Sequence, residues 1–411
     1  MITRILFICT LLSFPFFGST QTGTWLEKSD MLAARKEIAN AAVALDGKIY
    51  VIGGVLSDGS ITNKFESYDP SADTWEALAA YPLSVWRATA AAVNGKIYVF
   101  GGFQSLNPFP FNPSNKVYEY DPSTDSWTAK ANLLTARGAA TAVTVGGEIH
   151  LLGGAANSAL NLHHVYDPAT DNWSTATAMS ASRSGMTANV IEGKIYAVGG
   201  YFLGGGVVSQ STAEAYDPAT ESWSAIADLP FTKLGMASAV VRGKLYVFGN
   251  ENNANPLEYD PDSDAWQQLT PMPENVNFAG VAAVGDTIYV MGGGPVNLNR
   301  FDAKATTNCF LPDLVNAVGS VDAIPGFVLK NIFPNPVENE AVVEYELAKR
   351  AAVSISIISP SGQILETFVN EIQQSGTHKT QWNVSPKMGS GIYFLQIIID
   401  GKTVTRKLVL Q

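Results

Sequence analysis

Short apolar segments that end in a pair of glycines recur along most of this chain. In the first, residues 47–54, Tyr50, Val51 and Ile52 have the aromatic and β-branched character of a buried strand. Near-copies follow at 95–102, 147–154, 193–200, 243–250 and 285–293. Glycine lets the backbone leave a strand through angles that other residues rarely adopt. The pattern therefore predicts six buried strands, each followed by a sharp turn.

A second landmark follows each of the first five copies. It is Tyr-Asp-Pro with a tryptophan five residues after the proline. The tryptophans are Trp75, Trp127, Trp173, Trp223 and Trp266, at spacings of 52, 46, 50 and 43 residues. A period near 50 residues is typical of propeller blades. We expect each repeat to form four antiparallel strands, and a ring of such sheets would bury their faces.

The two ends of the repeat array are incomplete in complementary ways. Trp25 lies in a segment like those of the repeat tryptophans, yet nothing before it supplies the rest of a blade. At the other end, the sixth glycine motif has no tryptophan after it. We therefore expect the strand near Trp25 to complete the blade that begins near Asn277. The expected fold is all-β, with a six-bladed propeller over residues 21–305.

The glycine pair, Tyr-Asp-Pro and the spaced tryptophan together resemble the kelch-repeat family, from Thr24 to about Ala305. The resemblance implies a six-bladed kelch β-propeller. It does not imply a reaction, because kelch propellers include protein-binding modules, carbohydrate-active enzymes and a sialic acid mutarotase.

The first twenty residues have the three regions of a secretory signal peptide. Arg4 precedes an apolar run from Ile5 to Phe17, and Gly18-Ser19-Thr20 supplies small residues. This run of 13 residues is shorter than the roughly 20 that a membrane-spanning helix needs. We expect residues 1–20 to be removed on export, so that the mature chain has no transmembrane segment and Cys309 as its only cysteine.

The sequence pattern changes after the repeats. Residues 306–325 lack the blade landmarks and are expected to be a linker. Residues 326–411 alternate apolar and polar positions between turn signals such as Asp400-Gly401, which predicts a small β-sandwich.

This C-terminal module resembles the sorting domain of the type IX secretion system of the Bacteroidetes. The matching segments are Phe333-Pro334-Asn335-Pro336, Gly362-Gln363, Ser375-Gly376-Thr377-His378, Trp382-Asn383, Ser390-Gly391-Ile392-Tyr393-Phe394 and Thr405-Arg406-Lys407-Leu408-Val409-Leu410. The resemblance implies passage across the outer membrane by the type IX machinery, followed by release or attachment at the cell surface. The alternative is an accessory β-domain that binds glycans.

Charge excludes two classes of partner. The chain has a net charge of −11, and residues 21–325 hold 17 Lys and Arg against 30 Asp and Glu. Nucleic acids and anionic membrane surfaces need clustered basic residues, so neither is expected as a partner. The four histidines are scattered, and no phosphate loop or nucleophile elbow is present. We therefore expect no metal and no cofactor.

One set of residues has a recurrent position that suggests a ligand site. A polar residue precedes the inner strand of every blade: Arg35, Arg87, Arg137, Arg183, Lys233 and Asn277. The symmetry of a propeller brings equivalent positions together around one mouth of the central channel. We expect these side chains to bind a carboxylate-bearing ligand there. The alternative is that each cation pairs with an acidic neighbour or a loop carbonyl.

Two functions follow from this sequence and remain open. The favoured one is a secreted or cell-surface binding module whose propeller mouth recognises a protein or an acidic glycan. The alternative is an enzyme of the sialic-acid mutarotase (N-acetylneuraminate epimerase) kind, in which arginine holds the sugar carboxylate. No acid-base residue can be assigned for the alternative, so catalysis is less expected than binding.

Overall fold

The computed structural model describes residues 23–410 except 107–111, 204–206, 234, 250–254, 275, 296–301, 313–323, 325, 334–336, 338, 360–362, 386–387 and 390. The expected signal peptide lies outside these residues. The chain divides into two compact units, Met1–Pro312 and Asp313–Gln411. The described elements of both are β-strands apart from one short 3-10 helix, η1 (Ala39–Ala41), which confirms the all-β class.

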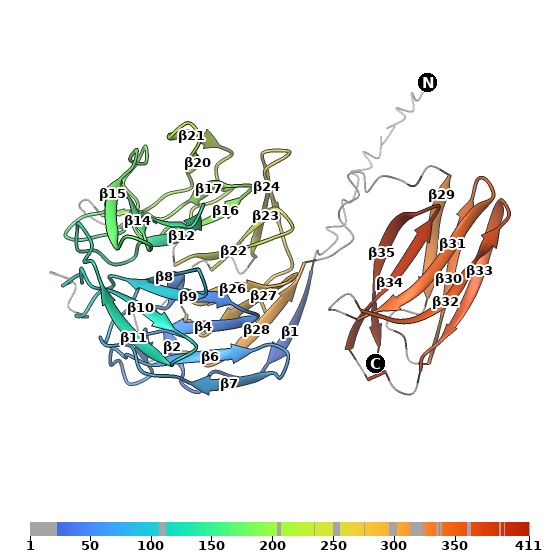
Figure 1. Cartoon of the computed structure of the whole chain (residues 1–411), viewed down its shortest axis with the longest axis horizontal. Helices are drawn as coiled ribbons and strands as arrows, with labels where there is room; N and C mark the ends of the chain where they lie inside the picture. Colours follow the sequence, from blue (N-terminus) through green and yellow to red (C-terminus); the bar gives the residue numbers. More distant parts are fainter. Residues whose placement is uncertain are drawn as a thin grey trace, which may run out of the picture. The chain divides into compact units, whose positions relative to one another are not determined.

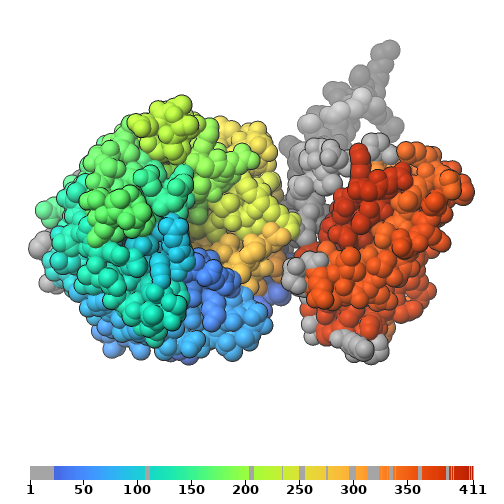
Figure 2. All heavy atoms as spheres, viewed as in Figure 1, coloured from blue at the N-terminus to red at the C-terminus, as the bar shows by residue number. Residues whose placement is uncertain are grey.

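The first unit contains six four-stranded antiparallel sheets, the blades. In Figures 1 and 2 they follow one another in chain order around a recessed centre. From inner to outer strand, blade 1 is β3 (Ala42–Leu45), β4 (Lys48–Ile52), β6 (Phe65–Asp69) and β7 (Thr74–Ala77), and blade 2 is β8 (Thr89–Val93), β9 (Lys96–Phe100), β10 (Val117–Asp121) and β11 (Ser126–Lys130). Blade 3 is β12 (Thr141–Val145), β13 (Glu148–Leu152), β14 (His163–Asp167) and β15 (Asn172–Thr175), and blade 4 is β16 (Thr187–Ile191), β17 (Lys194–Val198), β20 (Ala213–Asp217) and β21 (Ser222–Ile226).

Blade 5 is β22 (Ala237–Val241), β23 (Lys244–Phe248), β24 (Leu257–Asp260) and β25 (Ala265–Gln268). Blade 6 is β26 (Gly280–Val284), β27 (Thr287–Met291), β28 (Thr307–Leu311) and β1 (Thr24–Lys28). Two short ribbons lie outside the blades: β2 (Arg35–Lys36) pairs with β5 (Val55–Leu56), and β18 (Tyr201–Leu203) pairs with β19 (Val207–Ser209).

The first strand of the unit completes its last blade. β1 pairs antiparallel with β28, so that Trp25 lies opposite Phe310. The linker expected from residue 306 is therefore wrong at its start, because Thr307–Leu311 is the third strand of blade 6. Cys309 lies in that strand and is buried, not in a linker. Blade 6 lacks the Tyr-Asp-Pro sequence, so its third strand carries no landmark.

The repeat tryptophans join each blade to the one before it. Trp75 Nε1 donates a hydrogen bond of 2.8 Å to the carbonyl of Ser29, which follows β1 of the preceding blade. The equivalent bonds run from Trp127 to Ala79, Trp173 to Ala131, Trp223 to Thr177, Trp266 to Ala227 and Trp25 to Thr270. Six indoles therefore form a belt around the ring, and Trp25 supplies the bond that closes it.

The aspartates after Tyr-Asp-Pro have a structural role at the same boundary. The Tyr68 hydroxyl donates to Asp73 Oδ1 at 2.6 Å, and Asp73 Oδ1 also accepts from the backbone N–H of Ser29. The same pair of bonds recurs at Asp125, Asp171 and Asp264. The recurring tyrosine and aspartate therefore reinforce the inter-blade contacts.

The second unit is a β-sandwich. One sheet has the order β29 (Phe327–Phe333), β30 (Glu340–Leu347) and β33 (Gly376–Asn383). The other has the order β32 (Ile364–Gln373), β31 (Ala351–Ile358), β34 (Gly391–Ile399) and β35 (Lys402–Leu410). Ile355, Leu395 and Trp382 lie in a shared buried core, and Trp382 Nε1 donates to Glu366 Oε2 at 3.1 Å. This confirms the small C-terminal sandwich.

Replacement of Trp25 by Ala tests the closure of the ring. It removes the bond to Thr270 and the ring contacts with Phe248 and Phe310, so we expect a loss of about 2–4 kcal/mol in the free energy of unfolding. Urea unfolding of the intact chain measures this loss. Leu26→Ala is the control, because Leu26 lies on the same strand and is exposed. Equal stability of the two variants would contradict the closing role of Trp25.

Candidate functional site

The candidate site is the end of the propeller where the inner strands begin, which we call the loop face. It carries the glycine pairs and the segments that precede the inner strands. Neighbouring blades are joined here by backbone hydrogen bonds between residues with positive φ. Arg87 N donates to Glu37 O, Ala139 N to Arg87 O, Gly185 N to Ala139 O, and Phe278 N to Gly235 O.

Arg87 lies at the centre of the loop face. Its Nε donates to Glu37 Oε2 of blade 1 at 2.5 Å, and one terminal nitrogen donates to the Tyr201 hydroxyl of blade 4 at 2.7 Å. Its guanidinium carbon lies 3.9 Å from the ring centroid of Phe278 in blade 6. A group from blade 2 that contacts blades 1, 4 and 6 lies close to the propeller axis. Burial alone would lower the pKa of Arg87. The opposing effect of Glu37 and Tyr201 is larger in sum, so the pKa is raised above its ordinary value.

The other four cations lie inside the blades. Arg35, Arg137, Arg183 and Lys233 are at most 1% exposed. Each donates to the carbonyl of the glycine that follows the second strand of its own blade: Gly53 at 3.3 Å, Gly153 at 3.2 Å, Gly199 at 3.0 Å and Gly249 at 3.1 Å. These side chains therefore hold the turn after the second strand in blades 1, 3, 4 and 5.

Residues of the third strand complete the environment of these cations. Glu66 pairs with Arg35 at 2.8 Å, and Glu214 pairs with Arg183 at 3.2 Å. Burial lowers the pKa of both guanidinium groups, although the glutamates oppose the shift. Each ion pair therefore joins the segment before an inner strand to the third strand of the same blade.

Blades 3 and 5 have no glutamate at this position. Arg137 donates to His164 Nδ1 at 2.6 Å, which fixes the remaining proton of a neutral His164 on Nε2. Burial and the adjacent Arg137 lower the pKa of His164 to about 4. Lys233 has two carbonyl partners, Gly249 and Asn255, and burial lowers its pKa to about 8.

The expected convergent patch of cations is therefore wrong for Arg35, Arg137, Arg183 and Lys233. Arg87 also does not occupy the position in blade 2 that Arg137 occupies in blade 3. Val85 O accepts from Gly54 N as Arg137 O accepts from Gly102 N, so Val85 is the blade 2 counterpart of Arg137. Arg87 lies two residues further on, and this shift takes its side chain to the axis.

Asn277 also lies away from an open patch. It is 3% exposed, and neither its amide nitrogen nor its amide oxygen has a hydrogen-bond partner among the described residues. The partner residues Glu66, His164 and Glu214 were missed in the sequence. Each lies two positions before the tyrosine of Tyr-Asp-Pro, and that shared offset was the available signal.

Two further histidines are buried between blades 3 and 4. His150 Nδ1 and His163 Nε2 are 2.8 Å apart, and His163 Nδ1 lies 3.1 Å from the carbonyl of Thr177. The carbonyl only accepts, so a neutral His163 donates to it and accepts from His150. Burial lowers the pKa of both histidines to about 4, which keeps the pair neutral at physiological pH. Their arrangement serves packing against Tyr216.

A short ribbon also adds exposed apolar side chains to the loop face. The ribbon β18–β19 follows the glycine pair of blade 4, and Phe202 and Val208 lie opposite each other on its two strands. They are 41% and 57% exposed. Tyr201, at the base of the ribbon, is the residue that Arg87 holds. The mouth cluster, defined as Arg87, Glu37, Tyr201 and Phe278, therefore anchors the ribbon.

Within the described part of the chain, no three His, Cys, Asp or Glu side chains are grouped closely enough to hold a metal ion. No helix among these residues has the length and hydropathy needed to cross a lipid bilayer.

Family models match segments of both units. Residues 16–200 match the KLHDC2/KLHL20/DRC7 Kelch-repeats domain, and residues 182–230 match the Kelch motif. Residues 331–411 match the Secretion system C-terminal sorting domain. The two kinds of model cover the two units separately.

Curated relatives match over part of their length. Alpha-scruin of Limulus polyphemus is 30% identical over 33% of this chain and 15% of its own, and the kelch-like protein terF of Aspergillus terreus is 32% identical over 28% and 27%. The chain thus spans less than a third of these relatives. A solved structure of YjhT has a TM-score of 0.58 at 16% identity and covers 68% of this chain and 95% of that one. This likeness shows the shared fold alone.

Replacement of Glu214 by Ala tests the internal role of the cations. It leaves Arg183 buried without its counter-charge, and breaking a buried ion pair in this way costs about 3–5 kcal/mol. The control is Lys194→Ala, because the Lys194–Asp217 pair lies at the surface, where ion pairs contribute little to stability. We expect urea unfolding to separate the two variants clearly. Comparable losses would show that Arg183 does not depend on Glu214.

Proposed function

Because this chain is a kelch-repeat propeller followed by a secretion sorting domain, we propose that it is an exported binding module whose loop face recognises an apolar segment of a partner protein. The sorting domain implies export and a location in the medium or at the cell surface. We assign the export to the type IX machinery of the Bacteroidetes, with residues 1–20 as the signal peptide.

The observation that carries the proposal is the exposed ribbon β18–β19. Phe202 and Val208 are cross-strand neighbours, so they present one continuous apolar surface to solvent. Contiguous exposed apolar surface on a soluble domain is typical of a contact site. The bond from Arg87 to Tyr201 fixes the base of the ribbon, and pre-ordering of a contact surface lowers the entropy lost on binding.

An acidic glycan is a weaker candidate than a protein. Four of the five candidate cations are buried and already bonded, and Arg87 is already paired with Glu37. Residues 21–325 carry a net charge of −13, which repels an anion. The mutarotase alternative meets the same obstacle, since it needs a guanidinium available for the sugar carboxylate. These observations favour protein recognition.

A retention experiment with the intact chain tests the proposal. Immobilised wild type is compared with Phe202→Ser/Val208→Ser for retention of proteins from the medium and surface of the native host. The control is Leu32→Ser/Leu134→Ser, which replaces two exposed leucines outside the ribbon. We expect a protein that the wild type and the control retain and the ribbon variant releases, with the three melting temperatures within a few degrees.

Retention of the same proteins by the ribbon variant would contradict the apolar contact. An additional Arg87→Gln variant separates the acidic-ligand alternative. If Arg87→Gln abolishes retention that the ribbon variant preserves, and raised salt does the same, the ligand is anionic and the ribbon is not its site.

A further inference from the structure

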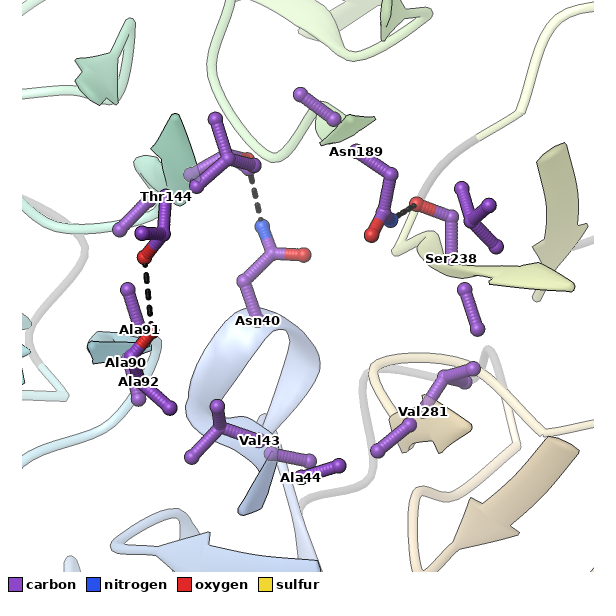
Figure 3. A pocket seen from close by; sticks show the side chains of 18 of the residues that line it. Asn40, Val43, Ala44, Ala90, Ala91, Ala92, Thr144, Asn189, Ser238 and Val281 are labelled. Atoms are coloured by element: carbon purple, nitrogen blue, oxygen red, sulfur yellow. Dashed lines mark hydrogen bonds between the residues drawn. The ribbon is translucent and has the colours of Figure 1, made fainter. Parts of the chain in front are cut away.

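The centre of the propeller holds a cavity of about 320 Å³ lined by the inner strands of all six blades. Its walls are mainly Ala and Val, with the polar residues Asn40, Thr141, Thr144, Asn189 and Ser238 (Figure 3). At the end where the inner strands turn into the second strands, the lining residues are all partly exposed. They are Ala44, Ala92, Thr144, Val190, Val240 and Ala283. The cavity therefore opens to solvent at the end opposite the loop face.

Asn40 closes the other end of the cavity. The segment between Arg35 and Lys48 is two residues longer than its counterpart between Arg137 and Glu148, and the extra length contains η1. From there Asn40 Nδ2 crosses the channel to Thr141 Oγ1 at 2.8 Å and to the carbonyl of Met186 at 3.0 Å. Figure 3 shows its side chain in the middle of the ring of lining residues. The channel is thus a blind pocket.

On one side of the pocket, threonine side chains form hydrogen bonds with the backbone of the wall. Each inner strand is an edge strand of its sheet, so the peptide groups that do not pair within the sheet face the channel. In blades 2 to 4, threonines cover these groups: Thr144 Oγ1 donates to Ala92 O at 2.9 Å, Thr141 Oγ1 donates to Met186 O at 2.9 Å, and Thr89 Oγ1 accepts from Ala142 N at 2.9 Å.

On the opposite side, formed by β22 and β26, the peptide groups lack such side-chain hydrogen bonds from the described residues. Among the described residues, no side chain hydrogen-bonds to the backbone of β22 or β26. Asn189 Nδ2 donates to Ser238 Oγ at 2.6 Å beside these strands, which leaves the Asn189 carbonyl oxygen directed to the pocket. Buried peptide groups require partners, because each unpaired one is costly. This wall therefore supplies both donors and acceptors to an occupant.

We propose that this pocket binds a neutral, polyhydroxylated molecule of monosaccharide size. No charged side chain lines it, and a desolvated ion without a counter-charge is strongly disfavoured. Hydroxyl groups both donate and accept, which suits the mixed donors and acceptors of the peptide edges. The volume is that of roughly ten water molecules at about 30 Å³ each, which is enough for one hexose ring. The site is separate from the loop face and does not depend on the proposed protein partner.

Ligand-observed NMR with the intact chain tests the proposal. The probes are the neutral sugars glucose and galactose and the hexitol sorbitol, with glucuronate and N-acetylneuraminate as charged comparators. We expect a neutral probe to bind and the charged probes to bind at least tenfold more weakly. Ala44→Leu, which adds bulk to the lining, is expected to weaken binding about tenfold or more. Ala77→Leu is the matched control on an exposed outer strand.

A crystal of the wild-type chain soaked in the best neutral probe gives a readout that does not depend on any variant. Density for the sugar beside Asn189 and Ser238 supports the assignment, and comparison with the methyl glycoside distinguishes a free sugar from the end of a glycan chain. Ordered water alone in the pocket, or neutral binding that Ala44→Leu leaves unchanged, overturns it. Equal binding of glucuronate and glucose overturns it as well.

Discussion

The hydrogen bond from a buried cation to the first glycine of a glycine pair organises this propeller. The same residue has a second task through its backbone: Arg137 O accepts from Gly102 N of the preceding blade while its side chain holds Gly153 O of its own. Arg183 and Arg35 repeat this arrangement with Gly154 and Gly293 of their preceding blades. One residue therefore fixes both the turn within a blade and the junction between two blades. The belt of indole bonds at the outer strands makes the second set of junctions.

This use of charge explains why the buried cations Arg35, Arg137, Arg183 and Lys233 do not form a ligand site. A guanidinium needs several acceptors once it is buried, and glycine carbonyls with a third-strand glutamate or histidine supply them. Arg35, Arg137, Arg183 and Lys233 are therefore internal, while the acidic residues of the repeats outnumber the basic ones. The two proposed binding sites lie instead at features that vary from blade to blade, namely the ribbon after Gly200 and the longer segment that carries Asn40.

The architecture was predictable from sequence because its determinants are local and repeated. The glycine pairs, Tyr-Asp-Pro and the tryptophans each mark a turn or a boundary, and Trp25 marked the closure. The third strand of blade 6 was not predictable in this way, since Thr307–Leu311 carries none of those residues. The site was harder, because an offset along the chain does not tell whether a side chain turns into its own sheet, as Arg183 does, or toward the axis, as Arg87 does. The pairing of Arg183 with Glu214 spans 31 residues and becomes visible only when the third strands are aligned.

The account depends most on the claim that the recurring cations are internal to the blades. Mass-spectrometric footprinting of the folded chain with a dicarbonyl reagent that modifies arginine measures their accessibility directly. Arg242, with about half of its side chain exposed, serves as the internal reference. The account predicts rapid modification of Arg242, with Arg35, Arg137 and Arg183 protected until the chain is unfolded. Modification of these three at the rate of Arg242 in the folded chain would contradict it.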